Sequence, residues 1–188
     1  TPFNHLGVQV SQWTDLDGDG RGELVLTAPW RPVEIWQYST QWQLMYKSSD
    51  RGWWTALQAL NVDEDPELEI VLGNLGLNSP FRATGNEPMV LYFGDCDNNG
   101  DTDAILTSFT DGVSYPFISR DDLLAQLPSL KKQFPDYASY ANATTKTLLT
   151  YLPSVQSDTI NELRSGYLDH HADGWTFVPF PQSAQVAP

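Results

Sequence analysis

The feature that most constrains this chain is a nine-residue acidic segment that occurs three times, at 15–23, 61–69 and 95–103. Each copy carries oxygen-bearing side chains at its positions 1, 3, 5 and 9, and each is followed directly by three apolar residues. In a tightly coiled loop, positions 1, 3 and 5 converge, position 7 offers its backbone carbonyl, and position 9 closes the cage. The sequence therefore predicts three β-hairpin loops that each hold a hard cation such as Ca²⁺, which binds about six to eight oxygens.

Two glycines and the place of the closing acid define the kind of loop. Gly20 and Gly100 stand at position 6, where a residue without Cβ permits the backbone turn. Pro66 replaces this glycine in the second copy, so we expect the 61–69 site to be the weakest. An EF-hand closes at position 12 between helices, whereas these loops close at position 9 between strand-like runs. For a single loop the alternative is a set of Asx-turns that bind no metal. Among hard cations we favour Ca²⁺ over Mg²⁺, because Mg²⁺ needs a stricter octahedral geometry.

The charge of the chain argues against several classes of partner. Its formal net charge is −14, its pI is about 4.2, and ten of its 24 acids stand at positions 1, 3, 5 and 9 of the three loops. Such a surface repels phosphate backbones and anionic lipid headgroups, so we expect no nucleic-acid partner and no anionic membrane surface. No apolar run reaches the ~18 residues that span a bilayer, so no membrane insertion is expected.

The affinity expected of such loops predicts a location. Extracellular calcium modules bind with dissociation constants of about 10⁻⁴ to 10⁻³ M, and cytosolic calcium would leave sites of this kind empty. We therefore expect an extracellular, cell-surface or periplasmic protein. The chain starts at Thr1 without a signal-like segment, which suggests a mature or excised product. Its single cysteine, Cys96, lies inside the third loop, so neither an intrachain disulfide nor a reactive nucleophile is expected.

The distribution of apolar residues predicts a mainly β fold with a helical insertion. Strand-like runs separated by turn residues lie at 6–10, 23–27, 33–38, 42–46, 67–72, 89–93 and 103–108. From Ser119, which can N-cap a helix, the spacing becomes helical, with further short helices expected at 130–134 and about 154–164. The expected organisation is propeller blades over 1–118, a helical insertion over 119–165, and a C-terminal hairpin and tail over 166–188.

The three loops resemble the FG-GAP (VCBS) repeats of integrin α-chain propellers and bacterial surface proteins, where Asp-x-Asp-x-Asp-Gly-x-x-Asp sits in a hairpin of a propeller blade. Five runs also resemble bacterial VCBS-repeat proteins related to the ASPIC/UnbV and cartilage acidic protein group: 73–78, 114–117, 119–124, 129–132 and 184–188. The resemblance covers most of residues 50–188, and before them the first loop alone. It implies a partial β-propeller of about three blades, calcium in the blade loops, an exported location and a recognition role.

Carried over by position, the resemblance also implies a set of ligands. They are Asp15, Asp17, Asp19, the Arg21 carbonyl and Glu23; Asn61, Asp63, Asp65, the Glu67 carbonyl and Glu69; and Asp95, Asp97, Asn99, the Asp101 carbonyl and Asp103. Asn61 and Pro66 depart from the pattern, so up to three ions are expected with the second site weak or empty. Closed propellers have about four to eight blades. Three blades therefore predict a piece of a larger propeller, or closure by a second copy of the chain.

Three other features have less specific interpretations. His170 and His171 are adjacent and would face opposite sides of a strand, which disfavours a shared transition-metal ion. The seven tryptophans are expected mostly in the core, with a carbohydrate-stacking surface as the alternative. Neither a Gly-x-Ser-x-Gly elbow nor a His-Glu-x-x-His motif occurs, and the loop acids are expected to be ligands, so we expect no catalytic residues and no enzyme.

The predicted function is a calcium-binding extracellular β-propeller module for recognition, adhesion or assembly. Its partner is expected to be a protein or a glycan outside the cell. Two alternatives remain open: a carbohydrate-binding accessory domain of a polysaccharide-degrading enzyme, and a structural subunit whose open sheet edges join neighbouring copies.

Overall fold

The computed structural model describes residues 7–63, 65, 67–152, 155–171 and 174–186. Strands account for 45% and helices for 14% of the chain, which confirms the predicted mainly β fold. The chain forms two compact units: the first comprises residues 1–80 and 162–188, and the second comprises residues 81–161. The second unit is therefore an insertion in the sequence of the first.

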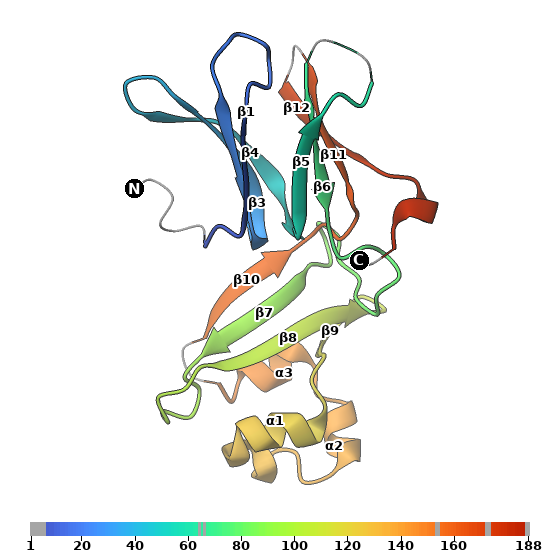
Figure 1. Cartoon of the computed structure of the whole chain (residues 1–188). Coiled ribbons are helices and arrows are strands. Elements are labelled where there is room, and N and C mark those ends of the chain that lie inside the picture. Colours follow the sequence, from blue (N-terminus) through green and yellow to red (C-terminus); the bar gives the residue numbers. More distant parts are fainter. Residues whose placement is uncertain (1–6, 64, 66, 153–154, 172–173, 187–188) are drawn as a thin grey trace. The chain divides into compact units, whose positions relative to one another are not determined.

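The first unit begins with a four-stranded antiparallel sheet whose strands follow the order of the chain (Figure 1). It consists of β1 (Val10–Thr14), β2 (Glu23–Thr27), β3 (Pro29–Tyr38) and β4 (Trp42–Trp53). These strands are rich in Leu, Val, Ile and Trp, which pack well on a pleated surface. The long β3–β4 pair contains three register shifts, so this ribbon bends along its length.

A second four-stranded sheet of the first unit joins two distant stretches of the chain. Its order is β12-β11-β6-β5, with all neighbours antiparallel. β5 (Ala56–Leu60) and β6 (Glu69–Gly73) precede the inserted unit, whereas β11 (Gly166–His171) and β12 (Gly174–Pro179) follow it. The β11–β12 pairing confirms the predicted C-terminal hairpin, although positions 172 and 173 of its turn lie outside the described residues.

Both sheets of the first unit contribute to one hydrophobic core. Its buried residues are Leu16, Val25, Val33, Ile35, Trp54, Ala59, Ile70, Leu72 and Leu168. Trp54 is 1% exposed, and its indole nitrogen donates to the Arg31 carbonyl at 3.0 Å, so its one polar atom is satisfied in the core. The tail after β12 forms the short 3₁₀ helix η2 (Gln182–Ala184) and docks through the buried Gln185, whose amide nitrogen donates to two backbone carbonyls.

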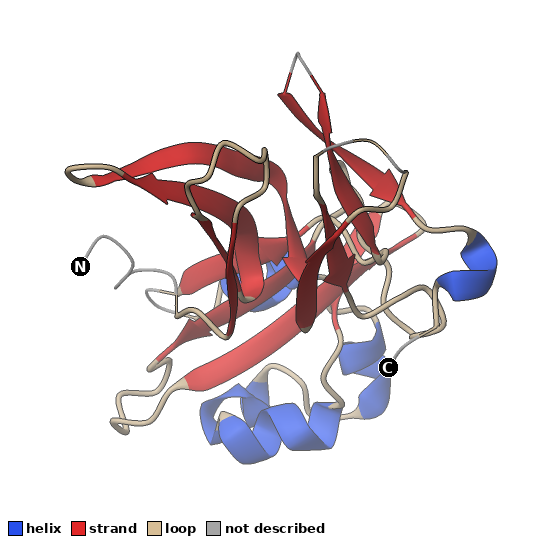
Figure 2. Ribbon diagram, turned by 45° about the horizontal axis from the view of Figure 1, so that its top comes forward, coloured by secondary structure: helices blue, strands red, loops and turns tan. Residues whose placement is uncertain are grey.

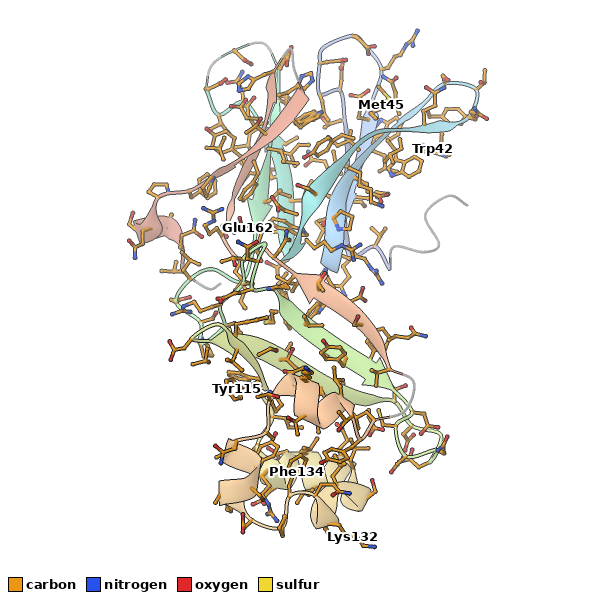
Figure 3. All side chains as sticks on the ribbon, turned by 180° about the vertical axis from the view of Figure 1, so that it is seen from behind. Trp42, Met45, Tyr115, Lys132, Phe134 and Glu162 are labelled. Atoms are coloured by element: carbon orange, nitrogen blue, oxygen red, sulfur yellow. The ribbon has the colours of Figure 1, made fainter. Side chains whose placement is uncertain are left out.

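The second unit combines one antiparallel sheet with a group of short helices (Figure 2). The sheet has the order β10-β7-β8-β9 and consists of β7 (Met89–Gly94), β8 (Asp103–Thr110), β9 (Val113–Pro116) and β10 (Gln156–Ile160). The helices are α1 (Arg120–Gln126), the 3₁₀ helix η1 (Pro128–Lys132), α2 (Tyr137–Ala141) and α3 (Thr145–Leu149). Buried leucines of α1, η1 and α3 form a second core with Ile105 of β8 and with Phe134 (Figure 3), which lies between η1 and α2.

The start of the helical region agrees with the sequence. Ser119 caps α1, and its hydroxyl accepts a hydrogen bond from the Asp122 backbone N–H. Asp121 and Asp122 lie in the first turn, where carboxylates interact favourably with the positive end of the helix dipole. Leu123 and Leu124 are buried, as their helical spacing predicts. No helix among the described residues is long and apolar enough to cross a membrane.

Two elements expected from the sequence differ from the structure. The helix expected at about 154–164 is replaced by β10, whose five residues pair with β7; Thr159 and Ile160 are β-branched, and the pairing satisfies backbone groups of β7. Within the described part of the helical insertion expected over 119–165, which leaves out 153 and 154, helices therefore occur over 120–149 only. The strand expected at 6–10 is β1 at Val10–Thr14, and residue 6 lies outside the described residues. Strands β5 and β9 have no counterpart in the expected set.

Candidate metal centres

Each acidic segment forms the loop of an antiparallel hairpin, and the three hairpins have the same register. The strand residue before the loop pairs directly with the acid at position 9. These pairs are Thr14 with Glu23, Leu60 with Glu69, and Gly94 with Asp103. The three loops therefore have the same length and begin and end at equivalent points of their hairpins.

The closing acid of each loop is folded back over its own hairpin. Its carboxylate accepts the backbone N–H of position 2, from Leu16 at 2.9 Å, from Val62 at 2.5 Å and from Cys96 at 2.9 Å. The three closing acids are only 5%, 1% and 4% exposed. Buried carboxylates are unusual unless they are paired or bind a metal. The repeated bond therefore holds one desolvated carboxylate at the base of each loop.

The alternating side chains at positions 3 and 5 also make equivalent bonds. In each loop the position 3 oxygen accepts the N–H of position 5, and the position 5 oxygen accepts the N–H of position 7. The first bond has lengths of 3.1, 3.2 and 3.2 Å in loop order, and the second 2.7, 2.8 and 2.7 Å. These contacts are Asx-turn bonds, and they occur at the same two positions of every loop.

At position 1 the second loop differs from the other two. Asp15 accepts the N–H of Gly20 at 2.9 Å, and Asp95 accepts the N–H of Gly100 at 3.1 Å. Both glycines have positive φ, 85° and 92°, a conformation that favours residues without Cβ. The second loop has proline at this position, which has no N–H to donate. Its position 1 residue, Asn61, instead donates its amide to the Asp65 carbonyl.

The structure brings carboxylates together in three groups, within each of which the candidate ligand atoms lie within 4.8 Å of one another. They are Asp15, Asp17 and Asp19; Asp63, Glu69 and Asp169; and Asp95, Asp97 and Asp103. Eight of these nine residues are among the predicted ligands. The ninth, Asp169, belongs to β11 and is not among the predicted ligands, because the spacing within the loops does not indicate a residue about a hundred positions further along the chain.

Other predicted ligands make different contacts. The Glu23 carboxylate lies outside the first group, and its Oε1 accepts the amide N–H of Gln37 at 2.8 Å. The Glu67 carboxylate lies 2.5 Å from Nδ1 of His170. The side chains of Asp65 and Asn99 accept N–H groups of their own loops, while Arg21, Glu67 and Asp101 donate N–H groups to position 5.

The electrostatics of the groups favour a cation. Two carboxylates at about 4 Å repel by roughly 1 kcal/mol in bulk water and by about 4 kcal/mol near a protein surface. Carboxylate and carbonyl oxygens are the ligands of hard cations such as Ca²⁺ and Mg²⁺. Burial raises the pKa of the Cys96 thiol, and the neighbouring Asp103, Asp95 and Asp97 raise it further. The neighbouring carboxylates therefore disfavour the thiolate form of Cys96.

The adjacent histidines have separate partners, as their alternation predicts. His170 lies beside Glu67, whereas Nε2 of His171 lies 3.2 Å from Oδ2 of Asp169. The first two loops are also linked to each other, because the Leu68 N–H donates to the Leu16 carbonyl at 2.9 Å. The second loop, which lacks an acid at position 1, therefore contacts both β11 and the first loop.

No family model, no curated protein and no solved structure matches this chain.

Proposed function

We propose that this chain is a calcium-binding β-propeller segment that acts outside the cytoplasm as a module for recognition, adhesion or assembly, without enzymatic activity. The observation that carries the proposal is the shared geometry of the three hairpin loops. They have one register and one bond from position 2 to a buried closing acid. Three carboxylates gather at each loop, all from the loop itself in the first and third cases and two from the loop plus Asp169 of β11 in the second. Irregular oxygen cages of this kind suit Ca²⁺ better than Mg²⁺, which demands near-ideal octahedral geometry.

Two properties of the sheets support a propeller. All three are four-stranded and antiparallel, as propeller blades are. In the first sheet the core residue Val25 lies two positions after the closing acid, whereas in the second sheet Ile70 and Leu72 lie one and three positions after theirs. Because successive strand residues face opposite sides, the two sheets present opposite faces to their shared core. Radial repetition of blades requires this front-to-back stacking.

Calcium titration of chelator-treated protein tests the proposal. We expect isothermal titration calorimetry to show uptake of up to three ions with dissociation constants of about 10⁻⁴ to 10⁻³ M. With about 10 mM calcium and a dissociation constant of about 1 mM, each site stabilises the folded state by about 1.4 kcal/mol. The melting temperature should rise accordingly, and magnesium should raise it less. Absence of both heat and a melting shift at this calcium concentration would contradict the proposal.

An exposed aromatic cluster on the first sheet favours carbohydrate binding as a second candidate function. Trp42 of β4 (Figure 3) lies 6.0 Å from Trp13 and 5.3 Å from Tyr38 between ring centroids. Trp13 and Tyr38 are 56% and 51% exposed, so the cluster offers ring surface on which a sugar could stack. Binding on a glycan array that Trp13→Ala abolishes and Tyr137→Ala retains would support this function; silence across the array would remove it.

A further inference from the structure

The second loop lies beside an acid from another part of the chain. β11 runs antiparallel to β6, and the pairing ends with Leu168 opposite Ile70. Extended by one step, this register would put Asp169 opposite Glu69, and their carboxylates do lie within 4.8 Å of each other. Directly opposite residues of an antiparallel pair project on the same side of the sheet, and like charges in such a pair are destabilising. Both residues are buried, with 8% and 1% of their surface exposed, so water screens this repulsion poorly.

One oxygen of Asp169 lacks the contacts that a buried carboxylate needs. Its Oδ2 lies 3.2 Å from Nε2 of His171. Its Oδ1 is buried and has no hydrogen-bond partner among the residues that the structure describes. A buried polar atom without a partner costs about 1–3 kcal/mol, and more when it is charged. This carboxylate lies in the group with Asp63 and Glu69, at the mouth of the second loop.

The first sheet shows what this position looks like without an acid. Gln37 stands opposite the closing acid Glu23 there, and its amide donates to the Glu23 carboxylate at 2.8 Å. The Gln37 amide stabilises the Glu23 carboxylate by donating a hydrogen bond to it, whereas the carboxylate of Asp169 adds a second negative charge beside Glu69. The second loop is also the one with Asn61 in place of an acid at position 1. With Asp169 included, each of the three groups contains three carboxylates.

We infer that Asp169 is a calcium ligand of the second loop, supplied by β11 in place of the carboxylate that Asn61 lacks. Its unpaired Oδ1 faces the ion together with carboxylate oxygens of Asp63 and Glu69, and His171 orients it through Oδ2. This inference rests on the proposed calcium binding. It makes the second site a full site that joins two strands from either side of the inserted unit, so that calcium also fastens β11 to the β5–β6 loop.

The test compares calcium uptake by the whole chelator-treated chain and three variants. Asp169→Asn keeps the shape of the side chain, removes its charge and can donate to Glu69 as Gln37 does to Glu23. Asp63→Asn changes a second, exposed ligand of the same site, where misfolding is not a concern. Asp111→Asn is the matched control: it removes one carboxylate from an exposed turn, and Asn tolerates the positive φ of 50° found there.

We expect calorimetry with calcium chloride to give three ions for the unaltered chain and for Asp111→Asn, and two ions for Asp169→Asn and Asp63→Asn. Asp169→Asn should melt no lower than the unaltered chain in chelator, because the buried repulsion is relieved, and should gain less from calcium. Three ions bound by Asp169→Asn at unchanged affinity would overturn the inference. Two ions bound by the unaltered chain and by Asp169→Asn alike would overturn it and leave the proposed function standing. No uptake by the unaltered chain would refute the proposed function itself.

Discussion

Asn74 is the residue whose replacement tests the packing of the first unit most directly. It follows β6, is 1% exposed, and its amide makes four hydrogen bonds. Its Oδ1 accepts the N–H groups of Trp53 at 2.9 Å and Leu75 at 2.8 Å. Its Nδ2 donates to the carbonyls of Glu162 at 2.9 Å and Arg164 at 3.2 Å. One amide therefore joins the end of β4, the end of β6 and the chain that returns from the inserted unit.

The expected loss on Asn74→Ala follows from these bonds. Each bond contributes about 1 kcal/mol net to the stability. The backbone groups that Asn74→Ala leaves without a partner add to the loss, because they lie near a buried residue and away from water. The bond to the neighbouring Leu75 should contribute least, because it is local. We expect the free energy of unfolding to fall by about 3–4 kcal/mol. This is a large share of a typical folding free energy of about 5–15 kcal/mol. For a chain of this size it corresponds to a fall in melting temperature of roughly 6–16 °C.

Circular dichroism melts in chelator, which keep calcium out of the comparison, provide the measurement. Asn86→Ala is the matched control, since this asparagine is exposed and its replacement should change stability by about 0.5 kcal/mol or less. Asn74→Asp should be at least as destabilising as Asn74→Ala, because it loses both donors and places a charge near the buried Glu162. If Asn74→Ala melts with the control, or if Asp at this position is tolerated, the reasoning fails.

Two further predictions concern the second unit and the C-terminal hairpin. Burial raises the pKa of Tyr140 to about 12, against about 10 in an unfolded chain, so its stabilising contribution is complete below about pH 10 and is lost by about pH 12. Tyr140→Phe should lower the stability by about 1 kcal/mol at pH 8, because the Ile118 carbonyl loses the hydroxyl that donates to it at 2.8 Å. Between pH 10 and 12 the variant should lose less stability than the unaltered chain. Urea unfolding at pH 8 and pH 11 measures both effects. Gly166→Ala would place a Cβ 2.4 Å from the Val178 carbonyl oxygen, so we expect it to cost about 1–3 kcal/mol in thermal melts, whereas Gly85→Ala, with open space around it, should be neutral; equal melting of the two variants would contradict the packing argument.

Much of the fold could be predicted because its signals are local. The strands expected at 23–27 and 89–93, the C-terminal hairpin and the helix that begins after Ser119 all follow from alternation, turn residues and capping within a few neighbouring residues. The helix expected at about 154–164 was wrong because the structure of this segment depends on a partner that is distant in the sequence. The segment carries Thr159 and Ile160 and becomes a strand because β7 offers unpaired backbone groups, which no local pattern shows.

The candidate site divides in the same way. A chain of alternating oxygens between two apolar runs determines a hairpin loop with inward carboxylates, because the side-chain directions of a short loop depend on residues within the loop itself. The sequence by itself therefore determined the three loops, their equivalent positions and the departure at Asn61 and Pro66. Only the tertiary structure decided that Asp169 stands beside Glu69, because that neighbourhood depends on β11 pairing with β6 across the whole inserted unit. Strand pairing over such a separation is settled by the global packing of apolar faces, which the spacing of residues along the chain does not contain.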